Sequence, residues 1–186
     1  MATFKTAVEY LPVLKWKQGE QGAVKPISLA TKSRMLPIAE LQDRTYDWKK
    51  GLYKKTWNEH LDKLALTTKN AWGKIHEIAV DMNSAFMPDL SKRSRHRHFA
   101  KLWDAGVQAV PVIGNYTSLP ERMELLGVAS QYGKSRWLLR YSFLEESEDL
   151  PSAAEVAGWF HNAVKDLGLD HHQVDAAVDL GHVGQW

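Results

Sequence analysis

Residues 109–143 read AVPVIGNYTSLPERMELLGVASQYGKSRWLLRYSF, and this stretch contains the repeating unit of the chain. Residues 109–114 and 137–143 are short apolar runs rich in β-branched and aromatic side chains, which indicates strands. Between them, Ser118 and Glu121 have the spacing of a capping box, and apolar residues follow at helical spacing. The stretch therefore predicts a strand, a helix and a parallel second strand.

The same alternation extends over the rest of the chain. Further strands are predicted at residues 10–16, 35–40, 75–82 and 175–183, and helices at residues 23–33, 47–72, 90–103 and 152–167. Within 47–72, one stripe that we expect to face the sheet contains Trp48, Leu52, Trp57, Leu61, Leu64 and Trp72, while Lys49, Lys50, Lys54 and Lys55 lie away from it. These units predict an α/β fold, namely a single domain over residues 1–186 that forms an incomplete TIM-like barrel of about six parallel strands. An open doubly wound sheet is the alternative.

A barrel with about six strands leaves unpaired strand edges, because a closed eight-stranded barrel usually needs roughly 250 residues. We expect a protein partner or self-association to cover these edges.

Composition excludes several classes of protein. The 186 residues include no cysteine, which excludes disulfides, cysteine-based zinc sites, iron–sulfur clusters and a thiol nucleophile. Residues 1–9 lack the pattern of a signal peptide, and no apolar run approaches the ~20 residues of a membrane span. The sequence therefore predicts a cytoplasmic protein with no membrane association. Its formal net charge of +2 means that nucleic-acid binding would need a local basic patch.

Charged side chains gather where the predicted strands end, which is where parallel βα folds place their functional groups. The candidate catalytic residues at these ends are Lys15, Glu40, Asp81, Arg140 and Asp179. Lys15 and Arg140 are suited to holding a phosphate or carboxylate, and the three carboxylates are suited to a divalent metal such as Mg²⁺. The same residues also fit salt bridges that close the end of a barrel, or solvated charges, and the sequence leaves these alternatives open.

The densest basic run is SKRSRHRH at residues 91–98. Lys92, Arg93, Arg95 and Arg97 are candidates for contacting nucleic-acid phosphates or an acidic partner, and a solvated helix face is the alternative. The pair His171 and His172 is interpreted as part of a loop, because adjacent residues do not share one face of a helix or strand.

Two segments carry a family resemblance. YLPVLKWKQGEQGAV at residues 10–24 and MLPIAEL at residues 35–41 resemble the opening of the Beta protein family, which is found mostly in phages and prophages. Shorter similarities follow in the later strands, so the resemblance spans nearly all of this chain, although it corresponds to only the N-terminal portion of a typical member. The resemblance implies a barrel fold and a phage-linked role in a bacterial host cell, and it names no reaction.

Two functional hypotheses follow. The leading one is a phage- or prophage-encoded protein that acts in phage–host or inter-phage conflict by binding a macromolecular partner. The alternative is a TIM-like barrel enzyme, a metal-assisted hydrolase that acts on a phosphate-bearing substrate. Whether the chain is an enzyme is left open by the sequence.

Overall fold

The structure is a computed structural model that describes residues 8–82, 92–143 and 151–179, with the side chains of residues 92–96 also outside the description. The chain divides into two compact units, Met1–Val110 and Pro111–Trp186, and each is described by itself. The prediction of one domain over residues 1–186 stays a prediction.

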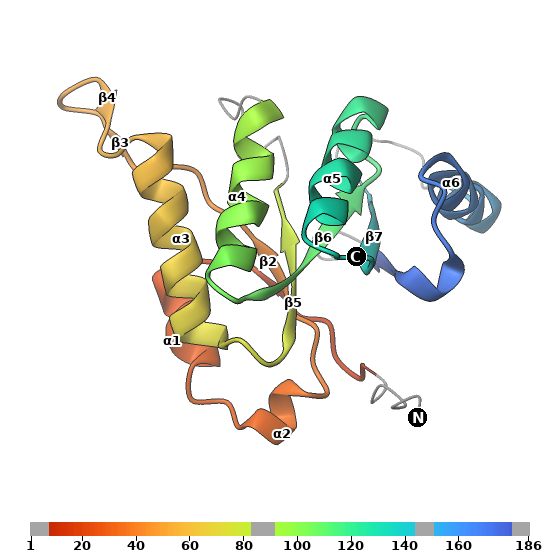
Figure 1. Cartoon of the computed structure of the whole chain (residues 1–186), viewed down its shortest axis with the longest axis horizontal. Coiled ribbons are helices and arrows are strands. Elements are labelled where there is room, and N and C mark those ends of the chain that lie inside the picture. Colours follow the sequence, from red (N-terminus) through yellow and green to blue (C-terminus); the bar gives the residue numbers. More distant parts are fainter. Residues whose placement is uncertain (1–7, 83–91, 144–150, 180–186) are drawn as a thin grey trace, which may run out of the picture. The chain divides into compact units, whose positions relative to one another are not determined.

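Six strands form one sheet in the order β1-β2-β5-β6-β7-β8 (Figure 1). They span Val13–Leu14 (β1), Ile38–Glu40 (β2), Glu77–Asp81 (β5), Gln108–Gly114 (β6), Trp137–Ser142 (β7) and Val174–Asp179 (β8). The pairs β1–β2, β2–β5, β6–β7 and β7–β8 are all parallel. The spatial order follows the chain without the reversal that defines a doubly wound sheet. The predicted incomplete TIM-like arrangement of six parallel strands is therefore confirmed.

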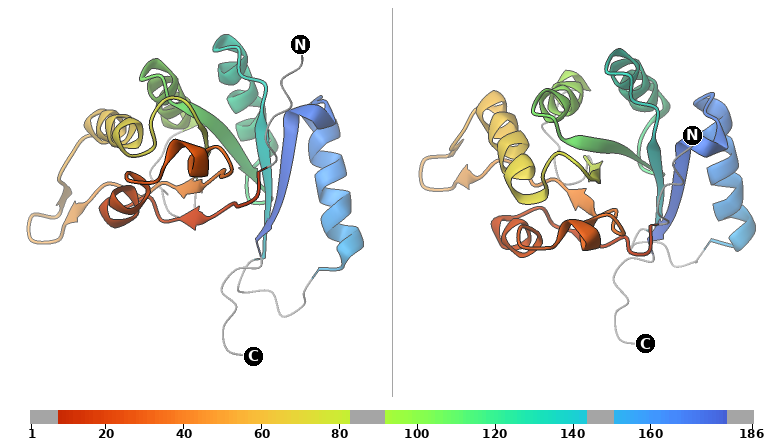
Figure 2. Two further views of the ribbon diagram at one scale, coloured as in Figure 1. Left: turned by 90° about the horizontal axis from the view of Figure 1, so that it is seen from below. Right: turned by 60° about the horizontal axis from the view of Figure 1, so that its bottom comes forward.

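In the first unit, helices pack against one another beside the strands. They are α1 (Gln18–Val24), α2 (Leu29–Lys32), α3 (Trp57–Trp72) and α4 (Lys92–Asp104). The α3 helix packs against both α1 and α4 (Figure 2). Its buried face includes Leu61, Leu64 and Trp72, and α4 contributes Phe99 and Leu102. The part of the predicted stripe from Leu61 onward therefore lies in the core, as amphipathic spacing requires.

The C-terminal end of α3 is capped by a buried lysine. The Nζ of Lys32 donates hydrogen bonds to the carbonyl oxygens of Ala71 and Trp72, at 3.1 and 3.2 Å. A cation at this end satisfies carbonyl groups that the helix leaves without intrahelical partners and complements the helix dipole. Burial lowers the pKa of Lys32. This lysine ties α2 to the end of α3.

The predicted helix over residues 47–72 is wrong at its beginning. A two-stranded antiparallel hairpin forms instead, with β3 at Tyr46–Asp47 and β4 at Leu52–Tyr53. Gly51, with φ of +65°, provides the left-handed conformation that the turn needs. The helix begins only at Trp57, where the Thr56 side chain and Glu59 form a capping box. Trp48, expected on the buried stripe, is 87% exposed.

The N-terminal segment also departs from expectation. Most of α1 falls in residues 17–22, between the predicted strand at 10–16 and the predicted helix at 23–33. The predicted helix itself is interrupted, and its second half contains only the short α2. Pro26 lies between the two helices and cannot donate the backbone hydrogen bond that a continuous helix would need. The first strand is limited to β1 and an isolated bridge between Tyr10 and Met35.

In the second unit, β7 lies between β6 and β8, with α5 (Leu119–Gln131), α6 (Ala153–Asp166) and a 3-10 turn, η1 (His171–Gln173), connecting them. The capping box predicted at Ser118 and Glu121 forms at the start of α5, and Ser152 and Glu155 form another at the start of α6. Trp137, Leu138 and Leu139 of β7 are buried, and Tyr141 contacts Trp159 of α6 with ring centroids 5.5 Å apart. The sixth strand was predicted to end at residue 183, and residues 180–183 lie outside the described residues. Within the described part of the chain, no helix is both long and apolar enough to cross a membrane.

Candidate functional site

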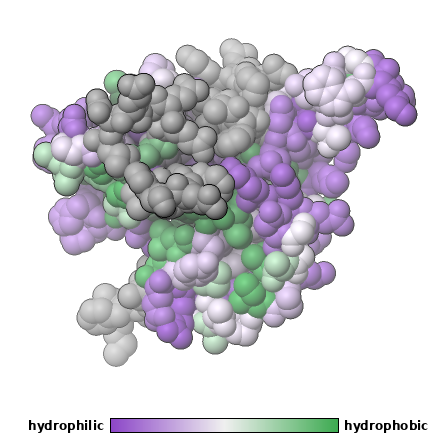
Figure 3. Space-filling model, turned by 180° about the vertical axis from the view of Figure 1, so that it is seen from behind, coloured by the Kyte–Doolittle hydropathy of each residue, from purple (hydrophilic) through white to green (hydrophobic). Residues whose placement is uncertain are grey.

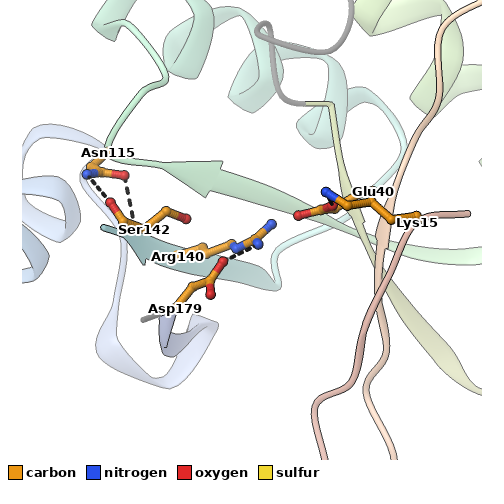
Figure 4. Close-up of polar contacts among 6 residues, drawn as sticks. All are labelled: Lys15, Glu40, Asn115, Arg140, Ser142 and Asp179. Carbon is orange, nitrogen blue, oxygen red and sulfur yellow. Dashed lines mark hydrogen bonds and ion pairs between the residues drawn. The ribbon is translucent and has the colours of Figure 1, made fainter. Parts of the chain in front are cut away.

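Three of the predicted site residues lie at the carboxyl ends of β1, β2 and β5. The Nζ of Lys15 forms an ion pair with Glu40 at 2.6 Å (Figure 4). Glu40 and Asp81 are direct partners in the β2–β5 register, so their side chains point to the same face of adjacent strands. Both carboxylate residues are buried, at 4% and 1% exposure, whereas the Lys15 side chain is half exposed.

The backbone around this cluster is fixed by the parallel ladder. The backbone N–H of Trp16 donates to the carbonyl oxygen of Glu40, and that of Leu41 donates to the carbonyl oxygen of Asp81. The indole of Trp16 is anchored in turn by a 2.8 Å hydrogen bond to the hydroxyl of Thr68 on α3. Two buried carboxylates beside one lysine are suited to binding a divalent cation or to moving a proton.

The remaining predicted site residues form contacts within the second unit. Arg140 of β7 is 4% exposed and forms an ion pair with Asp179 of β8 (Figure 4). Nearby, the amide of Asn115 donates to the carbonyl oxygen of Ser142 at 3.0 Å, and its oxygen accepts from the backbone N–H of Ser142 at 3.2 Å. Asn115 thus joins the loop after β6 to the end of β7.

A different group has the proximity that a metal site needs. Among the described residues, the group of three potential ligands whose donor atoms lie within 4.8 Å of one another is Asp170, His171 and His172. All three are exposed, and they belong to the capped 3-10 turn, where Asp170 accepts a hydrogen bond from the backbone N–H of His172. The two histidines lie in the connection before β8, in agreement with the loop interpretation. Because the turn is exposed, its three potential ligand atoms lie close together but do not form an enclosed site.

The basic run is only partly described. Lys92, Arg93 and Arg95 begin α4, but their side chains lie outside the described residues, and Arg97 is exposed. His98, the last residue of the run, is fully buried and belongs to the core. Nucleic-acid or acidic-partner binding by this run stays a prediction.

A basic pocket was missed by the sequence analysis. It has a volume of about 660 Å³, lies within the first unit, and is lined by Trp16, Lys17, Gln18, Gln21, Gln42, Thr45, Lys54, Lys55, His60, Lys63, Leu64 and Thr67. No acidic side chain is among these described lining residues. The signal in the sequence was the pair Lys54 and Lys55, which the helix predicted over residues 47–72 placed on a solvated face.

Comparison with known proteins gives one clear match. The family model described as Beta protein matches residues 10–186, which is nearly the whole chain. No curated protein and no solved structure matches the chain.

Proposed function

We propose that this chain, which belongs to the Beta protein family, acts in phage–host or inter-phage conflict by binding a protein partner along the outer edge of β8. One observation carries the proposal: β8 is the last strand of the sheet order, so one of its edges faces no described strand. A strand edge of this kind offers a row of backbone donors and acceptors to another chain.

The register identifies which residues of β8 present that edge. The backbone N–H of Phe143, next to β7, donates to the carbonyl oxygen of Asp179, so the backbone of Asp179 points toward β7. Because backbone groups alternate along a strand, the groups of Ala176 and Val178 point to the outer edge. Val178 is also 51% exposed, which gives a partner strand an apolar side chain to cover. Strand addition by an extended protein segment fits this arrangement.

The test uses proline, which removes a backbone N–H without adding charge. Ala176→Pro removes a donor from the outer edge and leaves the ladder between β7 and β8 intact, and Ala176→Ser is the matched control that keeps the donor. Bacteria expressing the unaltered chain are challenged with a panel of phages. We expect a changed plating efficiency for at least one phage, lost with Ala176→Pro and kept with Ala176→Ser.

Circular dichroism and thermal unfolding of the purified variants establish that Ala176→Pro remains folded. A folded proline variant that retains the full effect on plating would exclude the β8 edge as the binding surface. A panel in which the unaltered chain changes the plating of no phage would contradict the role in conflict.

A second candidate, metal-assisted hydrolysis of a phosphate-bearing substrate, is favoured by the buried pair Glu40 and Asp81 beside Lys15. In this function the carboxylates hold a divalent ion such as Mg²⁺ or transfer a proton, and Lys15 holds the substrate anion. A bound ion would supply charge stabilisation and an activated water. Two further roles stay predictions: Arg140 would be a second group that holds the anion, and Asp179 would be a third metal ligand.

This candidate predicts a thermal shift with Mg²⁺ or Mn²⁺, because an ion that binds only the folded state raises its stability. Glu40→Gln should abolish the shift and any hydrolysis of a generic phosphodiester. Asp170→Asn, which alters the exposed group at the 3-10 turn, should change neither. A shift that is lost in Asp170→Asn and kept in Glu40→Gln would assign the metal to the turn and refute the enzyme hypothesis.

A further inference from the structure

The β3–β4 hairpin has a defined tip. Its register pairs Tyr46 with Tyr53 and Asp47 with Leu52. The carboxylate of Asp47 accepts hydrogen bonds from the backbone N–H groups of Lys49 and Lys50, at 3.1 and 3.3 Å. The backbone N–H of Gly51 donates to the carbonyl oxygen of Asp47 at 2.9 Å, which closes the turn. These hydrogen bonds define the turn between the two strands.

That turn holds a tryptophan in solvent. Trp48 is 87% exposed, and its ring contacts Tyr46 edge-on, with centroids 4.7 Å apart. Full burial of a large apolar side chain stabilises a folded protein by about 1.5–3 kcal/mol, and exposed Trp48 does not contribute this stabilisation. Edge contact with one neighbour orients the indole and leaves most of its surface accessible. Trp48 is therefore an oriented aromatic surface with no described intramolecular cover.

The base of the hairpin is tied to α3 by stacking. The guanidinium of Arg44 lies over the ring of Tyr53, 3.8 Å from its centroid, and over the ring of Trp57, 4.3 Å from its centroid. Tyr53 belongs to β4 and Trp57 is the first residue of α3. Figure 1 shows the hairpin extending past the N-terminal end of α3. The arginine thus links the base of the hairpin to the first residue of α3.

Lysines continue from the tip to the basic pocket. Lys49 and Lys50 lie in the turn, and Lys54 and Lys55 follow β4. The backbone N–H of Lys54 donates to the carbonyl oxygen of Thr45 at 3.0 Å, so the hairpin ladder ends at two residues that line the pocket. In Figure 3, which shows the face opposite to that of Figure 1, the hairpin stands at the upper right and carries hydrophilic residues. We call Trp48, these four lysines and the pocket the hairpin strip.

Lysine is the basic residue that recurs around the pocket. It is lined by Lys17, Lys54, Lys55 and Lys63, all exposed, and these lysines form no ion pair with the described carboxylates. Burial lowers the pKa of His60, and the hydrogen bond between its Nε2 and the carbonyl oxygen of Gln42, at 2.9 Å, opposes this shift. The pocket is suited to an anion with several oxygen atoms, such as a phosphate group.

We propose that the hairpin strip binds single-stranded nucleic acid. Trp48 stacks on an exposed base, Lys49 and Lys50 neutralise the adjacent phosphates, and the pocket receives a further phosphate of the strand. The combination of a cationic path with an aromatic platform is how sequence-tolerant single-strand binding is achieved, because every base has a π-face. A duplex hides those faces in its stack, so the indole of Trp48 favours single strands.

The hairpin strip consists of residues of the first unit and β8 belongs to the second, so the two proposals rest on different residues and fail independently. An anionic membrane is the competing class of partner, since tryptophan and lysine also suit a lipid interface. The polar pocket at the end of the path argues against lipid, because Gln18, Gln42 and Thr45 offer hydrogen bonds that acyl chains cannot use.

The test is fluorescence anisotropy of a labelled thymidine oligonucleotide of about 12 nucleotides, within the site sizes typical of single-strand binders. The full chain is titrated over a range of salt concentrations, with a duplex of equal length, heparin and phosphatidylserine vesicles as competitors. We expect Trp48→Ala to weaken binding about 5- to 150-fold, with partial recovery in Trp48→Phe. Exposure of Trp48 predicts an unchanged melting temperature in both variants.

The charge arm compares two double variants with equal loss of charge. Lys49→Gln with Lys50→Gln should reduce the slope of log affinity against log salt by about 1.4, at roughly 0.7 per phosphate contact on a single strand. Lys25→Gln with Lys165→Gln, at exposed positions that are not part of the hairpin strip, should leave the slope unchanged. Ala176→Pro should also bind normally, which separates this site from the β8 edge.

Three outcomes would overturn the proposal. The first is no binding of the oligonucleotide by the unaltered chain. The second is equal competition by duplex, heparin and oligonucleotide with no effect of Trp48→Ala, which would indicate only a nonspecific cationic surface. The third is vesicle binding that depends on Trp48 without oligonucleotide binding, which would assign the hairpin to a membrane surface.

Discussion

His98 of α4 should make the folded state sensitive to acid. Burial lowers the pKa of its imidazole from 6.5 to about 3, with smaller contributions from His60 and Lys101. Neither ring nitrogen has a hydrogen-bond partner among the described residues. In the unfolded chain the same imidazole titrates at its ordinary pKa, so the unfolded state binds a proton that the folded state excludes.

The sign and size follow from these two values. The pKa of His98 is lower in the folded state than in the unfolded state. The contribution of its neutral imidazole to the free energy of unfolding is therefore complete above the unfolded-state pKa, and it is lost as the pH falls from 6.5 toward about 3. Between about pH 7 and about pH 5, the free energy of unfolding should decrease by about 2 kcal/mol through His98 alone. That is a large part of the 5–15 kcal/mol that typical domains possess.

The assay is urea unfolding at several pH values, comparing the unaltered chain with His98→Leu. The leucine variant fills the buried site without a titratable group, so its free energy of unfolding should fall about 2 kcal/mol less over the same pH range. His161→Gln, at an exposed histidine of α6, is the control and should behave like the unaltered chain. An identical pH dependence in His98→Leu and the unaltered chain would refute the reasoning.

Three further predictions concern stability. Lys32→Met should lower the free energy of unfolding by about 2–4 kcal/mol, because two helix carbonyls lose a charge-assisted donor; urea unfolding at neutral pH measures it. Gly114→Ala should lower it by about 1–3 kcal/mol, because the new Cβ would lie 2.2 Å from the Tyr116 ring, and Gly127→Ala, where a Cβ meets no neighbour, is the control. Asp175→Asn should change the melting temperature little, because its ion pair with an arginine is partly exposed and contributes less than about 1 kcal/mol; a large shift would contradict this.

The strand positions and fold class could be predicted because buried parallel strands are short apolar runs with clear boundaries. Glu40 and Asp81 were placed correctly at strand ends for the same reason: each directly follows a run of buried residues. That Glu40 and Asp81 are neighbours in the sheet could not be predicted directly. It depends on the order of the strands in the sheet, which a local sequence pattern does not specify. Lys32 could not be identified, since its two partners are about 40 positions away at the end of α3.

The hairpin was missed because its residues also fit a helix. Trp48 and Leu52 are spaced at i and i+4, so they extended the apolar stripe of α3 toward the N-terminus. Two local signals favour the turn instead: Asp47, whose side chain bonds to the next backbone N–H groups, and Gly51, which adopts positive φ. The capping box at Thr56 then marks where the helix begins, so the residues before it belong to the hairpin. Local chemistry outweighed periodicity here.

The consequence of that choice is functional. Had the helix continued to residue 47, the stripe would have placed Trp48 against the sheet and the nearby lysines on a solvated face. The turn instead leaves the indole of Trp48 87% exposed. The lysines that follow it along the chain lead to the pocket. Single exposed aromatic residues are common. Trp48 is less ordinary, because a closed turn holds it, Tyr46 contacts its ring, and lysines with no ion pair to a described carboxylate follow it. Such departures are expected where a surface is shaped for a ligand, and for this reason the hairpin strip is the first surface to test with nucleic acid.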